Sequence, residues 1–204
     1  MESNGLIPFL DFLSVQSANL VNQASDLVVR HARAEDATLL AELGARTFEE
    51  TFAADNRPEN MSAYLVSAFG QAQLAAELAD PHSLFLIAEI QEVAAGYAKL
   101  RAGVAPESVT NKKPIELERL YVSLEWLGRG VGAALMRACI AEAVQKGYRT
   151  IWLGVWENNH RARTFYRKWN FREVGEHIFQ LGDDPQTDIL MERLLAEETG
   201  SSFV

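Results

Sequence analysis

The sequence predicts an α/β (α+β) fold in which a mixed, mostly antiparallel central sheet carries helices on both faces. Two apolar strands separated by a short turn indicate a hairpin in the first half, and strand, helix, strand and helix alternate in the second half. The 204 residues include 48% hydrophobic and 23% charged side chains, which is close to the globular average and allows one well-filled core. We therefore expect one domain over residues 27–204, with residues 1–26 as an N-terminal appendage.

The individual elements follow from β-branched runs and amphipathic stretches. Strands are expected over residues 26–30, 84–90, 94–101, 115–122, 150–155, 171–179 and 187–194, and helices over 36–51, 59–68, 71–78, 130–146 and 159–169. Asp36 is placed to cap the first helix, and Gly147 stops the fourth in the usual C-terminal position for glycine. Turns are expected near Gln91-Glu92 and over the acidic segment 181–185, and a loop over 103–114.

Composition and charge exclude several classes of function. The net charge of −9 argues against a nucleic-acid partner, which needs a basic face, and suits a cationic ligand. No run of about 18 apolar residues occurs, so no membrane span is expected. The single cysteine, Cys139, lies in an apolar helical pattern and is expected to be a small buried hydrophobe, which fits a reducing, cytoplasmic location. The first basic residue is Arg30, so no signal peptide is expected.

A glycine loop between a strand and a long helix gives the strongest local signal. It reads Gly128-Arg129-Gly130-Val131-Gly132, and it favours phosphate because glycines admit a ligand close to the backbone and the amides of a helix start are free. The spacing of Gly128, Gly130 and Ala133 also satisfies a dinucleotide fingerprint, with Glu157 near the ribose-binding distance. That match is weak, because the alternating strands and helices of a dinucleotide-binding fold do not surround it.

A second motif follows the next strand. Asn159, Ala162 and Tyr166 are spaced to share one face of a helix, where a small Ala162 leaves room for a bulky ligand. Asn159 alone is typical of a helix N-cap and Tyr166 alone of a core aromatic. Together with the glycine loop, they favour a ligand site.

Through these motifs the chain resembles the GNAT superfamily of N-acetyltransferases over about residues 27–195. The resemblance rests on the strand Glu116–Val122, the loop Leu127–Gly132, and the series Asn159, Ala162, Phe165-Tyr166 and Phe171. The run His177–Asp188 is similar to the PaiA-type polyamine acetyltransferase branch. Two positions depart from the pattern: Leu127 replaces a polar residue at the start of the loop, and Asn170 replaces a glycine. Asn tolerates the left-handed backbone that the glycine would supply.

The resemblance implies an acyl-CoA N-acyltransferase fold and transfer of an acetyl group from acetyl-CoA to a primary amine, a polyamine being the favoured acceptor. It implies that acetyl-CoA is held by main-chain groups of Leu120, Tyr121 and Val122, by the loop and by the Asn159 motif. The implied cofactor set is Leu120, Tyr121, Val122, Leu127, Gly128, Arg129, Gly130, Val131, Gly132, Asn159, Ala162 and Tyr166. No metal is expected, because the four histidines are scattered.

Acetyl transfer needs a base for the amine and an acid for the leaving thiolate. Strand alternation places Glu116, Glu118, Leu120 and Val122 on one face, which makes Glu118 the first candidate base and Glu116 the second. A solvated edge or ion pairs with Arg119 or Arg101 would explain the same two carboxylates. Tyr166 is the candidate acid, since a phenol stays protonated at neutral pH.

Several alternatives stay open at this stage. The chain can be a protein lysine or N-terminal acetyltransferase, or a non-catalytic regulator that binds acetyl-CoA. The nicotinamide-dinucleotide hypothesis ranks last. A monomer and a homodimer are equally compatible with the sequence.

Overall fold

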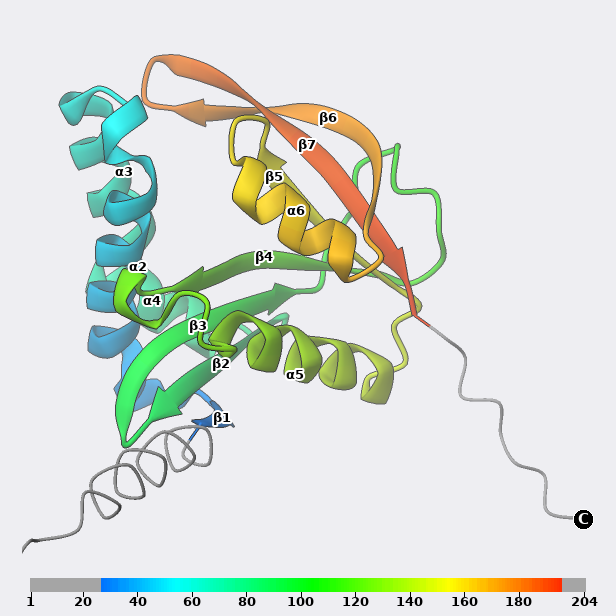
Figure 1. Cartoon of the computed structure of the whole chain (residues 1–204), viewed down its shortest axis with the longest axis horizontal. Helices are drawn as coiled ribbons and strands as arrows, with labels where there is room; N and C mark the ends of the chain where they lie inside the picture. Colours follow the sequence, from blue (N-terminus) through cyan, green and yellow to red (C-terminus); the bar gives the residue numbers. More distant parts are fainter. Residues whose placement is uncertain (1–26, 196–204) are drawn as a thin grey trace, which may run out of the picture.

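A computed structural model describes residues 27–195 of the chain (Figure 1). Within this range seven strands form one sheet in the order β1-β2-β3-β4-β5-β7-β6. Its strands are β1 Leu27–His31, β2 Ser83–Ile90, β3 Val93–Arg101, β4 Pro114–Val122, β5 Thr150–Trp156, β6 Arg172–Leu181 and β7 Asp184–Leu194. Neighbouring strands are antiparallel except for β4 and β5, which are parallel, so the predicted mixed and mostly antiparallel sheet is confirmed. The predicted appendage over 1–26 lies outside the described residues.

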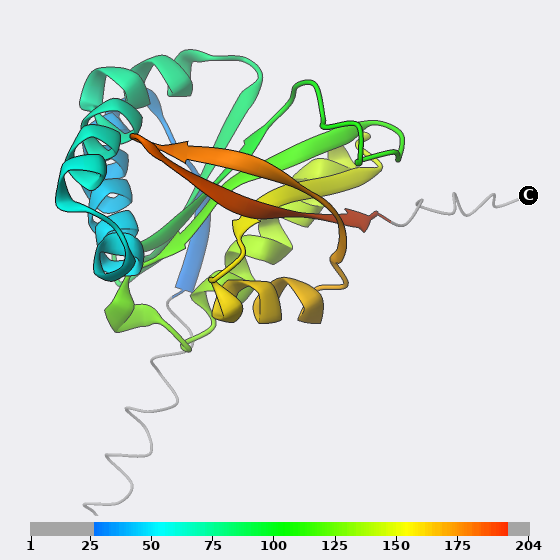
Figure 2. The same ribbon diagram turned by 90° about the horizontal axis from the view of Figure 1, so that it is seen from above.

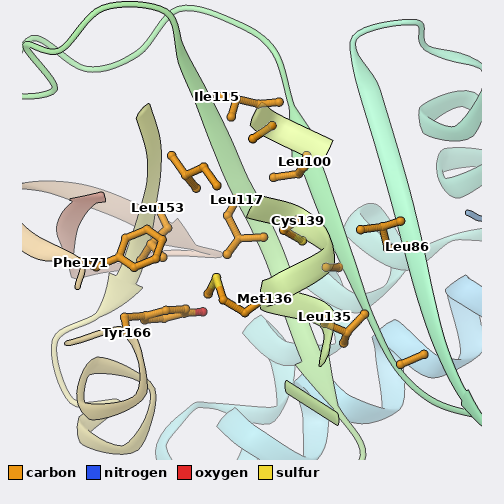
Figure 3. Close-up of a cluster of buried hydrophobic side chains, with 14 of the residues drawn as sticks. Leu86, Leu100, Ile115, Leu117, Leu135, Met136, Cys139, Leu153, Tyr166 and Phe171 are labelled. Atoms are coloured by element: carbon orange, nitrogen blue, oxygen red, sulfur yellow. The ribbon is translucent and has the colours of Figure 1, made fainter. Parts of the chain in front are cut away.

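Helices cover both faces of the sheet, as predicted (Figure 2). The helices are α2 Ala37–Phe52, α3 Pro58–Phe69, α4 Gln71–Ala79, α5 Val131–Gln145 and α6 His160–Lys168. On one face, α2, α3 and α4 bury a cluster that includes Leu40, Leu74 and Tyr97. On the other, α5 and α6 bury a larger cluster that includes Leu135, Met136 and Leu153 (Figure 3). Cys139 is fully buried in this second cluster, as expected.

Two left-handed residues end the helices on the second face. Gly147 has φ of 77°, and the Tyr148 amide donates to the Ala143 carbonyl at 2.9 Å, which closes the end of α5. Asn170 has φ of 62° and does the same for α6, where the Phe171 amide donates to the Tyr166 carbonyl at 3.1 Å. The prediction that asparagine would serve as this helix stop is confirmed.

Two local predictions are wrong. Asp36 precedes α2, but its carboxylate accepts from the Arg33 amide at 2.7 Å and pairs with Arg30 instead of capping the helix. The predicted five-residue turn over 181–185 is shorter, because Leu181 already pairs with Asp184 across a turn of two residues. Pro185 is accommodated in β7 because the pairing of β7 with β5 extends only as far as Asp188.

Replacing Asn170 with valine should lower the free energy of unfolding by about 1 kcal/mol, because a β-branched side chain is strained in the left-handed region. Asn170→Gly, the matched control, should leave stability at or above that of the wild type. Urea unfolding followed by circular dichroism measures both. Equal stability of the valine variant would show that the helix stop does not depend on this backbone conformation.

Candidate functional site

The sheet opens between its two parallel strands. β4 and β5 pair only from Pro114 with Thr150 to Glu116 with Trp152. Beyond that point β4 stays paired with β3 and β5 with β7, so the two strands diverge and leave facing edges without a strand partner in the described part of the chain (Figure 1). A cavity of about 1120 Å³ lies along this gap.

The cavity gathers most of the predicted cofactor residues. Of these, the ones that line it are Leu120, Tyr121, Val122, Leu127, Gly128, Gly130, Gly132, Asn159, Ala162 and Tyr166. Arg129 and Val131 do not line it. The Arg129 guanidinium lies over the Trp126 ring at 5.2 Å, and Val131 is buried in the core beneath α5.

The glycine loop presents open amides to the cavity. Gly128 and Gly130 have φ of 78° and 88°, values that a residue with a side chain rarely adopts. The Ala134 amide donates to the Gly130 carbonyl at 2.9 Å, so the preceding amides of the first turn are not used by the helix ladder. Free amides of this kind can bind phosphate oxygens, so phosphate binding at the start of α5 stays a prediction from the sequence.

Trp126 is a functional candidate that the sequence analysis missed. Its ring lines the cavity, and its Nε1–H is buried without a hydrogen-bond partner among the described residues. A buried donor without a partner is costly, so a bound ligand that accepts from Nε1 would be favoured here. Nothing in the spacing of the sequence marks this donor, because its burial depends on how the loop folds against the sheet.

The second motif is assembled as predicted. Asn159 caps α6, its Oδ1 accepting from the Ala162 amide at 3.0 Å, and Asn159, Ala162 and Tyr166 all line the cavity. Tyr166 reaches from α6 toward Met136 of α5 (Figure 3). Burial, with a smaller contribution from Cys139, raises the pKa of Tyr166 above its ordinary value, so its hydroxyl stays protonated at neutral pH.

A β-bulge in β4 overturns one prediction. Lys99 of β3 pairs with Arg119, and the next residue, Leu100, pairs with Leu117, so Glu118 is an extra residue in β4. The extra residue interrupts the alternation on which the prediction of a shared face depended.

The four residues predicted to share one face are consequently split. Leu120 and Val122 pack on the α5 side of the sheet. Glu116 and Glu118 lie together on the α4 side, where both contact Arg101.

Both candidate bases are held by cations. Glu116 accepts from Arg101 Nη2 at 2.7 Å and Nε at 3.0 Å. Glu118 lies 3.0 Å from Lys99 Nζ, 3.0 Å from Arg101 Nε and 3.7 Å from Arg119 Nη2. The ion pairing that the sequence left as an alternative is therefore present at both carboxylates.

Glu77 of α4 completes this ion cluster from the helix layer. It lies 2.8 Å from Lys99 Nζ and 2.8 Å from Arg119 Nη1. Burial alone would raise the pKa of Glu77, but Arg119 and Lys99 outweigh it and hold the pKa below its ordinary value. The cluster therefore balances three cations, Lys99, Arg101 and Arg119, with three carboxylates, Glu77, Glu116 and Glu118.

The wall across from β4 is aromatic and acidic, and the sequence analysis gave its residues no role. Phe52 lies 6.0 Å from Trp156, and Tyr64 lies 5.5 Å from Phe179, measured between ring centroids. His177 and Asp188 line the same wall. Both residues belong to the run His177–Asp188, which is similar to the PaiA-type branch. The predicted five-residue turn would have placed a different residue of β7 opposite His177.

Comparison with known proteins assigns the family. Residues 40–171 match the model of the acetyltransferase (GNAT) family, and an uncharacterized N-acetyltransferase of Lactobacillus delbrueckii subsp. lactis is 34% identical over 153 residues, 75% of this chain and 88% of its own. The chain therefore belongs to the GNAT family and is an N-acetyltransferase that uses acetyl-CoA. The dinucleotide hypothesis does not fit this family.

Solved structures show the same fold. The PaiA N-acetyltransferase of Thermoplasma acidophilum, in complex with coenzyme A, has a TM-score of 0.66 and 21% identity, over 82% of this chain and 98% of its own. A putative acetyltransferase of Salmonella typhimurium with acetyl-CoA has a TM-score of 0.61 and 19% identity, over 87% and 99%. In the described part of this chain, no helix is both long and apolar enough to span a membrane.

Replacing Glu77 with glutamine should lower the free energy of unfolding at pH 7 by about 3 kcal/mol, because two buried cations lose their shared carboxylate. The pKa of Glu77 is lower in the folded state than in the unfolded state. The carboxylate therefore contributes its full stabilisation above the unfolded-state pKa, and this stabilisation is lost as the pH falls through the folded-state pKa. The difference between the two proteins should therefore shrink below about pH 4.3, the ordinary glutamate pKa.

Urea unfolding of wild type and variant over a pH series measures this difference. Glu107→Gln, at an exposed loop position, is the control for the loss of one negative charge and should change stability little. A difference for Glu77→Gln that stays constant with pH would contradict the electrostatic explanation.

Proposed function

We propose that the protein acetylates the primary amine of a small cationic molecule, with a polyamine as the favoured acceptor. The observation that carries this proposal is the wall of the cavity opposite β4, which combines the rings of Phe52, Tyr64 and Trp156 with the carboxylate of Asp188. Aromatic faces attract cations, and a carboxylate adds Coulomb attraction. The net charge of −9 would concentrate such a ligand around the protein.

Cationic side chains border the cavity on the side of the glycine loop. Arg161 and Lys168 enter from α6, where the phosphates of acetyl-CoA would be held. Their positive charge supports an anionic donor along this side of the gap.

The open edges of β4 and β5 fit the extended arm of acetyl-CoA. We assign the main chain of Leu120, Tyr121 and Val122 to this arm and the loop Leu127–Gly132 to the phosphates. The side chains of Tyr121 and Leu120 pack into the two cores, which leaves their backbone groups as the polar atoms available at the edge. Asn159 and Ala162 border the same channel from α6.

The chemistry requires a neutral amine, an activated carbonyl and a protonated thiol. An alkylamine of pKa about 10.4 must lose a proton at a cost of roughly 4–5 kcal/mol at pH 7, so a base in the cavity assists the reaction. We assign Tyr166 as the acid that protonates the departing sulfur. For the base, Glu118 and Glu116 remain the proposals from sequence, although both are engaged by cations.

Tyr166→Phe should reduce kcat by about 10²–10⁴-fold and leave the Kd for acetyl-CoA nearly unchanged, because the hydroxyl that donates the proton is removed while the ring is kept. Free-thiol release with spermidine, spermine, small monoamines and lysine peptides measures kcat, and quenching of tryptophan fluorescence measures Kd.

The acceptor panel separates the open alternatives. Preferential turnover of a polyamine supports the proposed acceptor, whereas turnover of the lysine peptides alone would replace it with a protein substrate. Binding of acetyl-CoA without thiol release from any acceptor would indicate a regulator. An unchanged kcat in Tyr166→Phe would remove Tyr166 from the role of acid.

A further inference from the structure

His177 of β6 and Asp188 of β7 form a pair that faces the cavity. They are directly opposite each other in the β6–β7 register, and His177 Nε2 lies 3.4 Å from Asp188 Oδ2. The Asp188 side chain is 16% exposed and that of His177 is 42% exposed, so the carboxylate is nearly covered while the imidazole stays open to the cavity. Burial raises the pKa of Asp188, and His177 opposes that rise.

Gly154 of β5 brings this pair to the gap. A Cβ at Gly154 would lie 3.1 Å from His177 Nε2 and 3.3 Å from Asp188 Oδ2, so both side chains lean across β5 into the space that glycine leaves. Gly154 lies two residues beyond Trp152, where the pairing of β5 with β4 ends. The pair therefore lies beside the opening of the sheet.

The carboxylates on the β4 side are both engaged in the ion cluster, although burial raises the pKa of Glu116 above its ordinary value. Protonation of Glu116 would leave the Arg101 guanidinium without its closest partner, and protonation of Glu118 would weaken its contacts with both Lys99 and Arg101. His177 has a carboxylate beside it, and within residues 27–195 it forms no ion pair or hydrogen bond with a cationic side chain. An imidazole also takes up and releases protons near neutral pH, which suits a base that must be regenerated in every catalytic cycle.

We infer that His177 is the base that deprotonates the acceptor amine and that Asp188 is the positioning residue that orients the imidazole and stabilises its charged form. This inference rests on the proposed amine acetyltransferase activity. The ammonium gives one proton to His177, and the neutral nitrogen attacks the thioester carbon. The C–N bond forms and the C–S bond breaks as Tyr166 protonates the sulfur. The second amine proton restores Tyr166, and His177 releases its proton to solvent.

The pH dependence follows from the groups around His177. The charged and titratable groups that share its cavity come from six elements: Asp188 on β7, Glu50 on α2, Tyr64 on α3, Arg101 on β3, Glu116, Glu118, Arg119 and Tyr121 on β4, and Arg161, Tyr166 and Lys168 on α6. The base must be neutral to act, so kcat/KM should fall as the pH drops and His177 becomes protonated. Asp188→Asn should lower kcat, because the imidazole loses the carboxylate that orients it.

The experiment compares pH profiles of kcat/KM for full-length wild type, His177→Gln, Glu118→Gln and Asp188→Asn with the acceptor selected from the amine panel. His177→Gln should lose at least 10-fold in kcat with an unchanged Kd for acetyl-CoA, and its acidic limb should no longer show the ionisation seen in wild type. Glu118→Gln should retain that ionisation. His31→Gln is the matched control, because His31 pairs with Glu142 at 2.7 Å outside this cavity.

Chemical rescue distinguishes a proton acceptor from a structural role. Added imidazole should restore part of the activity of His177→Ala, and circular dichroism should show that this variant is folded. If His177→Gln keeps the wild-type profile, or if Glu118→Gln alone removes the acidic ionisation, the inference is overturned. A wild type that acetylates none of the amines would overturn the proposed function and this assignment together.

Gly154→Ala provides an independent test of the geometry. The added methyl group displaces the imidazole and the carboxylate by a few tenths of an ångström without straining a left-handed backbone. Turnover should fall while the Kd for acetyl-CoA and the melting temperature stay close to wild type. Full turnover in this variant would show that the placement of His177 over β5 does not matter for the reaction.

Discussion

The short parallel pairing of β4 with β5 is the constraint on which the site depends. After Glu116 and Trp152 the two strands separate, yet each stays fixed by its other neighbour, β3 or β7. The edges that face the gap carry backbone groups without a strand partner in the described structure, and such groups favour an extended polar ligand that can pair with both edges. The glycine loop and α6 then border the one place where the sheet is open.

The bulge at Glu118 and the ion cluster behind it set the character of the β4 wall. Lys99 is only 2% exposed and lies beside Glu77 and Glu118, so the carboxylates are neutralised within the protein before any ligand arrives. Removing one member leaves a buried charge without its partner, which makes the cluster sensitive to substitution whatever its chemical role. Loss of activity in a Glu118 variant therefore identifies a base only when the pH profile changes with it.

Local signals in the sequence predicted the local parts of the site. The left-handed stops at Gly147 and Asn170 and the glycine loop follow from backbone preferences of single residues, and the Asn159 motif follows from helical spacing. The bulge and the divergence of β4 from β5 depend on partners far along the chain, so strand alternation alone misplaced Leu120 and Val122. The β6–β7 turn is a second example. A two-residue turn at 182–183, in place of the predicted five residues, sets the register that places His177 opposite Asp188.

The acid and the base proposed here approach the gap from opposite faces of the sheet. Tyr166 comes from α6 and belongs to the core on the α5 side, where burial keeps its hydroxyl protonated. His177 leans over Gly154 on the other face, beside the Asp188 carboxylate that would orient its ring. The reacting carbonyl would lie between them. One group therefore takes the proton from the amine and another gives a proton to the sulfur. Because the two groups lie in different layers of the fold, the surroundings of each can change without altering the other.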